Sequence, residues 1–424
     1  MARFRPFRAI RFSPAAVGGF DDVVAPPYDV ISQDARDELY ASSPYNVTRL
    51  ILNTDGHEAA GELYRQWQRD GVLARDEQPA FYLYCQDFES GGARRRVGLI
   101  GALHLEPFDR GVVRPHEQTF AHHKKDRLVL TGETRANLSP IFGLFSNPEF
   151  SPEPDGGWDT PPDVDVVHEG VRNRLWPVRS PAAVAAVRDA VANRTIFIAD
   201  GHHRYETALN YFGEACPGEQ LVAGAGGPDD DEQPAAHVMA FLGAFEDPGM
   251  IILPTHRELV SSGGADAGAF VDALERAFTV ERIEKGDAGR RRILERLDGE
   301  AVEANAFAVA LRDVPDYLYI RRPAAGGGAA KDALDVTVLH SVVLDELLRG
   351  AGGAEARLEY SADARQVLDR ADDGLTEGAF LMRPMRAEQM AEVCMAGELL
   401  PQKSTYFYPK LLTGLTFHAL ERQA

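Results

Sequence analysis

The chain has few cysteines and no long apolar run. Its 424 residues include only three cysteines, Cys85, Cys216 and Cys394, which lie far apart and form no CxxC pair. The sequence therefore predicts neither a disulfide framework nor a cysteine-built zinc site. No apolar stretch approaches membrane-spanning length, and the first residues lack the apolar core of a signal peptide. We expect a cytoplasmic protein with no membrane partner.

Positive charge is also scarce. The 45 Lys and Arg residues face 65 Asp and Glu residues, which gives a formal net charge of −20. Nucleic acids and anionic membranes attract the opposite sign, so we expect no nucleic acid partner. A local basic pocket for one small phosphate ligand remains compatible with this charge. The composition leaves the oligomeric state open.

Several nucleotide and hydrolase motifs are missing. The patterns GxxxxGK[ST], GxGxxG and GxSxG do not occur. The sequence therefore offers no motif for a P-loop protein, a dinucleotide-binding fold or an α/β-hydrolase. Lys403-Ser404-Thr405 fails the P-loop pattern because Gln402 stands where glycine is required. The histidines show neither HExxH nor a regular zinc spacing, which gives a zinc site little support.

Strand and helix signals alternate along the chain, whose length fits two or three domains. We predict an α/β to α+β protein with segments at residues 1–110, 111–260 and 261–424. Ser32 and Ser180 are predicted helix caps, and residues 46–52 have the composition of a strand. We interpret residues 254–257, Pro-Thr-His-Arg, as structural.

The stretch Asp200-Gly201-His202-His203-Arg204 carries the strongest functional signal. An apolar, β-branched run at 194–198 predicts a buried strand before it, and apolar residues at helical spacing follow it. Gly201 would let a ligand approach the backbone closely. The positive end of the following helix and the planar fork of Arg204 both suit a phosphate, and Asp200 could hold a metal ion or accept a proton. The alternative is a capped helix start and nothing more.

A second group of candidates surrounds residues 116–127. Glu117 could act as a general base or help to hold Mg²⁺, while Lys125 and Arg127 could neutralise phosphate. The alternative interpretation is a solvated charged helix, which is the usual fate of such a run. The choice between the two stays open at the level of sequence.

The segment Lys403 to Lys410 combines two lysines with three adjacent aromatic residues. Its β-branched and aromatic composition predicts an extended segment in which Phe407 is buried. We expect Lys403 or Lys410 to lie near the pocket of Arg204, where it would add positive charge for a phosphorylated ligand. A strand far from that pocket is the alternative.

The chain resembles two known groups of proteins, a superfamily and a family. Asp200, Gly201, His202 and Arg204 match a signature of the ParB/sulfiredoxin-like superfamily, in which the loop opens a helix and binds nucleotide phosphates. The free L-serine kinases of that superfamily are closest in motif, and their upstream glutamate resembles Glu117. Over nearly its whole length the chain resembles the uncharacterised family called domain of unknown function 1015. That resemblance is carried by residues 27–31, 137–142, 199–209 and 403–410.

These resemblances imply a ParB/sulfiredoxin-like core with flanking segments and a nucleotide-dependent phosphotransferase for a small hydroxyl compound, with free L-serine as the first candidate. ATP or ADP would be the donor. Mg²⁺ would be held by Asp200 and Glu117, which with His202 form the catalytic set. The phosphate-binding set is Gly201, His203, Arg204, Lys125, Arg127 and Lys403. A phosphohydrolase and a nucleotide-binding regulator without turnover are the alternatives.

Overall fold

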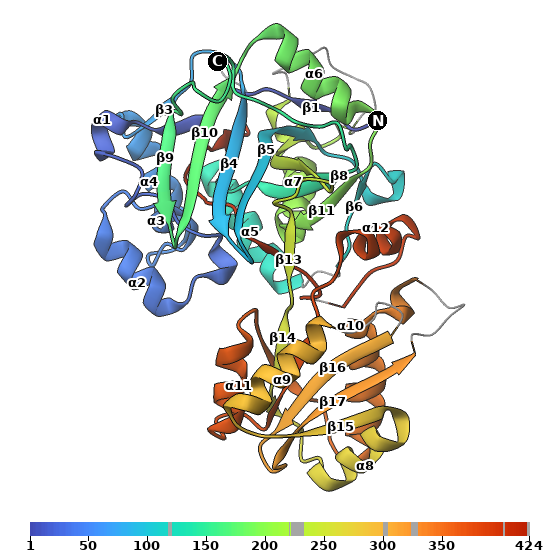
Figure 1. The fold of residues 1–424 in the computed structure, drawn as a ribbon. Coiled ribbons are helices and arrows are strands. Elements are labelled where there is room, and N and C mark those ends of the chain that lie inside the picture. The colour runs from blue at the N-terminus through green and yellow to red at the C-terminus, as the bar shows by residue number, and fades with distance from the viewer. Residues whose placement is uncertain are drawn as a thin grey trace. The chain divides into compact units, whose positions relative to one another are not determined.

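The computed structural model describes residues 1–117, 121–219, 221, 233–299, 304–323, 330–401 and 403–421. The chain forms two compact units (Figure 1). Unit 1 comprises Met1–Pro115, Thr119–Ile251 and Phe407–Ala424, and unit 2 comprises His116–Gln118 and Ile252–Tyr406. The mixed α/β fold class is confirmed by the sheets and helices of both units. These units do not follow the three consecutive segments expected from the sequence, because the end of the chain returns to unit 1.

A nine-stranded sheet forms the centre of unit 1. Its strand order is β6-β11-β8-β12-β5-β4-β10-β9, and β1 pairs with β5. The strands are β1 (Phe4–Arg5), β4 (Phe81–Glu89), β5 (Ala93–His104), β6 (Val113–Arg114), β8 (Ile141–Phe145), β9 (Val164–His168), β10 (Val171–Val178), β11 (Ile196–Asp200) and β12 (His237–Ala244). Two short pairs accompany the sheet, namely β2 (Ile10–Phe12) with β3 (Leu73–Arg75) and β7 (Ala136–Asn137) with β21 (His418–Ala419).

Two helices of unit 1, α2 (Gln33–Ser42) and α6 (Pro181–Ala192), begin where a serine side chain caps them. Ser32 accepts a hydrogen bond from the backbone N–H of Ala35, and Ser180 accepts one from that of Ala183, so both predicted caps are confirmed. The helices are α1 (Pro14–Val17), η1 (Tyr28–Val30), α2 (Gln33–Ser42), α3 (Thr48–Ile51), α4 (His57–Arg69), η2 (Phe108–Arg110), α5 (Ala121–Thr134), α6 (Pro181–Ala192), α7 (His202–Ala215) and η3 (Pro234–Ala236).

The strand predicted at residues 46–52 is wrong, because the chain forms α3 there. The Asn46 side-chain oxygen accepts hydrogen bonds from the backbone N–H of Thr48 at 3.0 Å and from its hydroxyl at 2.7 Å. Asn46 is fully buried. A buried side-chain turn from Asn46 to Thr48 therefore overrides the strand propensity of the apolar residues that follow.

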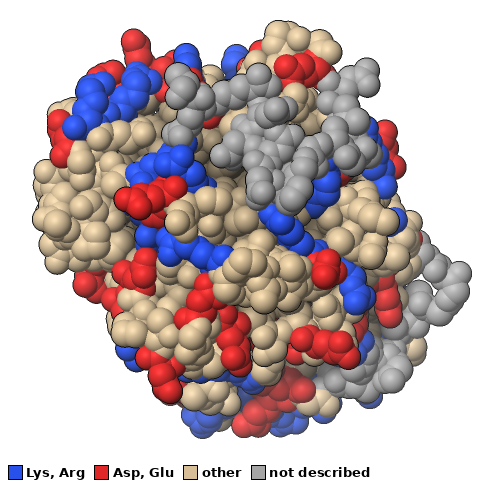
Figure 2. All heavy atoms as spheres, turned by 90° about the horizontal axis from the view of Figure 1, so that it is seen from above, with Lys and Arg blue, Asp and Glu red and all other residues tan. Residues whose placement is uncertain are grey.

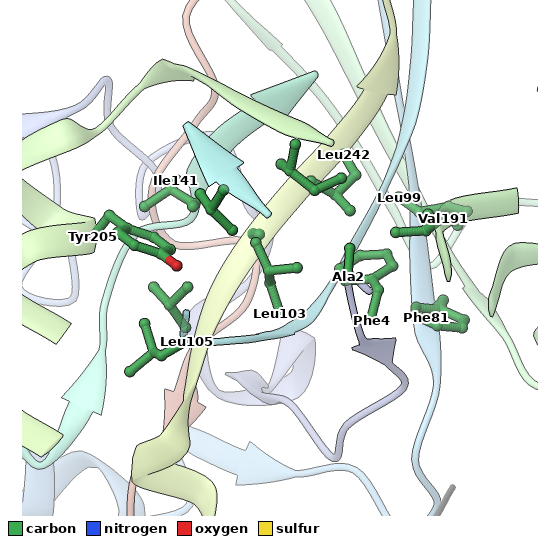
Figure 3. Packing of buried hydrophobic residues seen from close by; sticks show 14 of the residues in the cluster. Ala2, Phe4, Phe81, Leu99, Leu103, Leu105, Ile141, Val191, Tyr205 and Leu242 are labelled. Atoms are coloured by element: carbon green, nitrogen blue, oxygen red, sulfur yellow. The ribbon is translucent and has the colours of Figure 1, made fainter. Parts of the chain in front are cut away.

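The two faces of the unit 1 sheet bury different partners. On β4 the alternate residues Phe81, Leu83 and Cys85 join the main apolar core with side chains of α6 and α7. Figure 3 shows Phe81 in this core, together with Val191 of α6 and Tyr205 of α7. The opposite face of β4 carries polar groups, and the Tyr84 hydroxyl accepts a hydrogen bond from the backbone N–H of Leu412. The C-terminal segment is thus tied to the sheet.

Unit 2 contains a six-stranded sheet of order β15-β17-β16-β19-β14-β18. Its strands are β14 (His256–Ser261), β15 (Thr279–Glu284), β16 (Ala304–Leu311), β17 (Asp316–Pro323), β18 (Arg357–Ser361) and β19 (Gly378–Met382). Its helices are α8 (Ala267–Ala277), α9 (Asp287–Asp298), η4 (Ala330–Ala333), α10 (Asp335–Val338), η5 (Leu339–Leu348), α11 (Ala364–Asp372) and α12 (Ala387–Met395). The chain passes between the units on either side of His116–Gln118 and again within β13 (Ile251–Leu253) and β20 (Tyr406–Tyr408).

Helices cover both faces of this second sheet. On β16 the small side chains of Ala306, Ala308 and Ala310 face one core with residues of α9 and α11. The alternate residues, at 307, 309 and 311, are large and face a second core with residues of α8 and η5. This period-two alternation of size places a layer of helices on each side of the strands.

Candidate functional site

The start of α7 in unit 1 has the strand, turn and helix that the sequence predicts. Residues 196–199 of β11 are buried, and Asp200 ends the strand. Helix α7 follows at once with His202, after a turn at Gly201. Tyr205 fixes the first turn of α7, because its buried hydroxyl both accepts from the backbone N–H and donates to the carbonyl oxygen of Glu106, each at 2.9 Å.

Gly201 is required at the turn for two reasons. Its φ is +88°, in the left-handed region that side-chain-bearing residues rarely adopt. In addition, a Cβ atom at this position would lie 3.0 Å from Nε of Arg204 and 3.1 Å from its Cζ. The guanidinium of Arg204 therefore folds directly over the glycine, at the positive end of the helix dipole.

Arg204 connects the turn to neighbouring backbone and to Asp200. One of its amino groups donates to the carbonyl oxygen of Pro140, and the other lies 3.1 Å from Oδ2 of Asp200. The side chain is 14% exposed. These contacts use two of the five N–H bonds of a guanidinium, which leaves the group able to bind further acceptors.

A second cation reaches Asp200 from the C-terminal segment. The ammonium nitrogen of Lys410 lies 3.8 Å from Oδ1 of Asp200. Asp200 thus has a cation within 4 Å of each carboxylate oxygen. Lys410 near the pocket of Arg204 confirms one of the two placements expected from the sequence. Phe407 is buried, with Tyr406 and Tyr408 half-buried on either side, so the expected alternation is confirmed as well.

Buried Arg96 holds this segment in place. Arg96 has no exposed surface, and its guanidinium donates to the carbonyl oxygens of Tyr408 and Pro409 and to the side-chain oxygen of Gln86. Its cation also lies 4.9 Å from the ring centre of Phe142. Burial lowers the pKa of Arg96 to about 10. The backbone just before Lys410 is therefore fixed from the sheet interior.

The sequence reasoning missed Arg96, which is the last of three consecutive arginines at 94–96. Only Arg96 is buried, while Arg94 and Arg95 are exposed. The available signal was that Arg96 is followed directly, in the same strand, by the uncharged run at residues 97–103.

Beside Arg204 lies a cavity of about 50 Å³ lined also by Tyr28, Arg127 and Thr207. The cation of Arg127 stacks 4.3 Å from the ring centre of Tyr28. Burial raises the pKa of Tyr28, while Arg204 and Arg127 act to lower it. The Thr207 hydroxyl is buried without a hydrogen-bond partner. A cavity of this size admits a few water molecules or one small group rather than a whole nucleotide.

The structure thus brings Arg127 to the same cavity as Arg204. Lys125 is exposed and does not line that cavity. In the first turn of α7, His202 is 8% exposed and His203 is partly buried. The roles expected for these residues stay predictions.

Glu117 and Lys403 belong to unit 2. The Glu117 carboxylate accepts hydrogen bonds from three consecutive backbone N–H groups, those of Lys403 at 3.2 Å, Ser404 at 2.9 Å and Thr405 at 3.2 Å. Lys403 has a left-handed φ of 56°, which turns these N–H groups toward one point. Its side chain is exposed. In this position Glu117 closes a turn, and its predicted catalytic role stays untested.

Magnesium has weak support from the donor set. Among the described residues no group of three or more His, Cys, Asp or Glu side chains converges as metal ligands. Asp200, in unit 1, already has Arg204 and Lys410 near its two oxygens, so a divalent ion there would be a third cation. Glu117 uses its oxygens on backbone N–H groups. These residues do not fit a metal site that the protein builds alone.

The surface charges and the helix lengths concern the nucleic acid and membrane partners that the sequence does not lead us to expect. Figure 2 shows basic and acidic side chains interspersed on the face that it draws. Within the described part of the chain, no helix is both long enough and apolar enough to cross a bilayer.

The fold and the site describe a two-unit α/β protein with a motif-bearing helix start in the first unit. The chain belongs to the family described as "Protein of unknown function (DUF1015)", whose model matches residues 4–338. This confirms the resemblance over the length of the chain noted from the sequence. The comparison with curated proteins found no match.

Solved structures that are similar to the chain have low sequence identity to it and low TM-scores. A conserved hypothetical protein from Pyrococcus furiosus is 16% identical, with 71% of this chain and 89% of that chain covered and a TM-score of 0.34. A free serine kinase in complex with AMP is 14% identical, with 70% and 83% covered and a TM-score of 0.33. A C-terminally truncated SbnI from Staphylococcus aureus is 10% identical, with 74% and 85% covered and a TM-score of 0.34.

Proposed function

We propose that the protein is a nucleotide-dependent phosphotransferase that acts on a small hydroxyl compound, with free L-serine as the first candidate. One observation carries the proposal: the Arg204 guanidinium lies over Gly201 at the start of the 14-residue helix α7. A bare glycine, a helix dipole and a planar cation at one point form a phosphate-binding arrangement. The Asp200-to-Arg204 motif also supports a ParB/sulfiredoxin-like core in unit 1.

The proposed chemistry relies on charge neutralisation and positioning. Phosphoryl transfer spreads negative charge over the moving phosphate, so fixed cations stabilise its transition state. Arg204 and Lys410 supply two such cations beside Asp200. The acceptor hydroxyl oxygen forms a bond to phosphorus while the bond to the nucleotide breaks, and Asp200 takes the hydroxyl proton. The leaving nucleotide phosphate keeps the electron pair of the broken bond.

The remaining candidates have supporting roles in this proposal. Arg127 adds positive charge at the cavity beside Arg204, and His202 and His203 belong to the first turn of the phosphate-binding helix. Lys125 is exposed and would meet the donor phosphates only at longer range. The role expected for Lys403, which belongs to unit 2, stays a prediction. ATP or ADP is the proposed donor. Any Mg²⁺ would arrive on the donor phosphates, which commonly carry it, and no step depends on it here.

The test is a transfer assay followed by ³¹P NMR. Purified protein is incubated with ATP or ADP and a panel of hydroxyl amino acids that includes L-serine. We expect a new phosphomonoester signal that depends on the acceptor and is lost in Arg204→Ala. Arg69→Ala is the matched control, because Arg69 is an exposed arginine of unit 1 paired only at the surface with Glu62. Free phosphate alone would instead indicate a phosphohydrolase, and tight nucleotide binding without turnover would indicate a regulator.

A further inference from the structure

Unit 2 contains a larger cavity that the proposed function does not use. Its volume is about 230 Å³, many times the roughly 10–15 Å³ that admits one water molecule. Strand β14 and the residue before it contribute Arg257 and Thr255, and the turn closed by Glu117 contributes Ser404. Two further arginines, Arg383 and Arg386, also line it. All these residues belong to unit 2.

Arg257 is the central group of this cavity. It is 1% exposed. Its two amino groups donate to the carbonyl oxygens of Thr255 and Lys403, whereas its Nε has no hydrogen-bond partner. Among the described residues no carboxylate lies within ion-pair distance of it. Burial lowers the pKa of Arg257 to about 10, so the group remains a cation at neutral pH. The Glu117 carboxylate acts on Arg257 only through space and raises its pKa. A buried cation without an ion-pair partner is costly unless a ligand supplies the opposite charge in contact with it.

A second, independent observation comes from Thr255. Its hydroxyl is buried and has no hydrogen-bond partner, although Thr255 lines the cavity. Native structures rarely leave buried polar atoms unsatisfied. Two unpartnered polar groups at one cavity indicate that an acceptor belongs between them.

The other charges of the lining favour an anion. Asp335 is occupied by Arg383, whose Nε lies 2.7 Å from Oδ2 of Asp335. The remaining lining acid, Asp298, is exposed, as is Arg386 at the rim. Because these other charged groups are paired or exposed to solvent, the positive charge of Arg257 is the one that remains inside the cavity.

We infer that this cavity is a binding site for a small oxyanion-bearing metabolite, with a carboxylate or phosphate group against Arg257 and Thr255. The volume fits a compact metabolite, since drug-sized sites occupy about 300–1,000 Å³. The guanidinium matches the geometry of either oxyanion, and the cavity's apolar lining, which includes Leu334, Val336 and Met382, would cover the carbon skeleton. This site is independent of the phosphotransferase proposal.

The experiment is isothermal titration calorimetry on the full chain carrying Arg204→Ala, so that the α7 site does not contribute. The probes are inorganic phosphate and malonate. We expect saturable one-site binding of at least one probe, and which probe binds identifies the oxyanion. Thr255→Val should weaken that binding about fivefold, as for one lost hydrogen bond. Arg257→Met should weaken it at least about thirtyfold, as for a lost charged partner.

The control is Arg349→Ala, which removes an exposed arginine of unit 2 outside the cavity and should leave binding unchanged. Thr255→Val removes only an unpartnered hydroxyl, so this variant should fold. It therefore tests the anion site even if Arg257→Met does not fold. No saturable binding of either probe, or unchanged affinity in Thr255→Val, would overturn the inference. Because the α7 site is disabled throughout, its own failure would leave these outcomes unaffected.

Discussion

The start of α7 in unit 1 and the 403–405 turn in unit 2 each hold a carboxylate among donors, but the donors differ in kind. Asp200 faces two cationic side chains, Arg204 and Lys410, at 3.1 and 3.8 Å. Glu117 faces three backbone N–H groups of one turn. Side-chain cations can exchange one anion for another, whereas backbone donors are fixed by the fold. Asp200 is thus held by side chains and Glu117 by the backbone of a turn, and the catalytic roles predicted for both stay predictions.

A similar contrast separates two buried arginines. Arg96 and Arg257 are equally buried, and burial lowers the pKa of each to about 10. Arg96 donates hydrogen bonds to the Gln86 side chain and to two backbone carbonyl oxygens. Arg257 keeps one N–H without a partner beside a cavity. Unsatisfied donors beside open volume, rather than burial or pKa, distinguish a ligand site from a structural anchor.

The largest expected effect is that of Asp200→Asn on turnover. The substitution keeps the size and a hydrogen-bonding oxygen but removes the charge. We expect turnover to fall by about a hundredfold or more, the range for a lost acid–base group. The thermal midpoint should stay near that of the wild type, because Asp200 does not cap α7 and an Asn oxygen can still accept the hydrogen bond from Arg204. Steady-state kinetics and a thermal melt check both parts; unchanged turnover would return Asp200 to a structural role.

The next effect is the loss of donor affinity in Arg204→Ala. Hydrogen bonds to charged groups contribute about 1.5–3 kcal/mol, so nucleotide binding should weaken roughly thirtyfold. Arg204→Lys should recover only part of the loss, because an ammonium lacks the planar fork. Calorimetric titration of ADP measures this, with Arg69→Ala as the unchanged control. Equal affinity in a folded Arg204→Ala protein would remove the donor site from α7.

Glu117→Gln should act on stability instead of turnover. The carboxylate loses its charge while three N–H groups still point at the side chain, so we expect the free energy of unfolding to fall by about 1–2 kcal/mol. Turnover should change by less than about threefold. Urea unfolding and kinetics are the measurements. Glu275→Gln, at an exposed ion pair of the same unit, should lower stability less. A hundredfold loss of turnover with normal stability would instead establish the catalytic role predicted for Glu117.

The smallest expected effect is a change of stability with pH. It tests whether His256 resists protonation in the folded interior beside Arg257. Burial and the Arg257 charge lower the pKa of His256 to about 4, and its Nδ1 accepts a hydrogen bond from the backbone N–H of Met382. The unfolded chain binds this proton near pH 6.5. The unfolded state therefore binds more protons between pH 6.5 and 4, and stability falls as pH falls through that window.

His256→Gln keeps an acceptor for Met382 without titrating. Between pH 7.5 and 5.5 the wild type should lose roughly 1 kcal/mol more of unfolding free energy than the variant. Urea unfolding at the two pH values gives this difference. Parallel losses in the two proteins would show that His256 protonates as readily in the folded state as in the unfolded chain.

Local features of the site could be predicted from the sequence. The buried strand before Asp200, the glycine turn and the start of α7 follow from propensity and pattern within a dozen residues. The caps at Ser32 and Ser180 are equally local. The strand expected at residues 46–52 is wrong because the buried side chain of Asn46 forms a turn to Thr48 that starts a short helix, and burial is not visible in the sequence.

Long-range placement could not be predicted in the same way. Lys410 reaches Asp200 because Arg96, more than 300 residues earlier, binds the backbone at 408 and 409. At the level of sequence Arg257 is interpreted as structural, because a lone His-Arg pair is weak evidence of a site. A lone His-Arg pair in the sequence does not reveal which of its donors will be satisfied after folding.

The central claim is that the start of α7 binds the donor phosphates, and a crystal structure with ADP tests it most directly. We predict that the terminal phosphate lies about 3 Å from the Arg204 guanidinium, over Gly201 and beside Asp200. ADP bound with its phosphates elsewhere, for example against Arg257 in unit 2, and no phosphate at Arg204 would contradict the account.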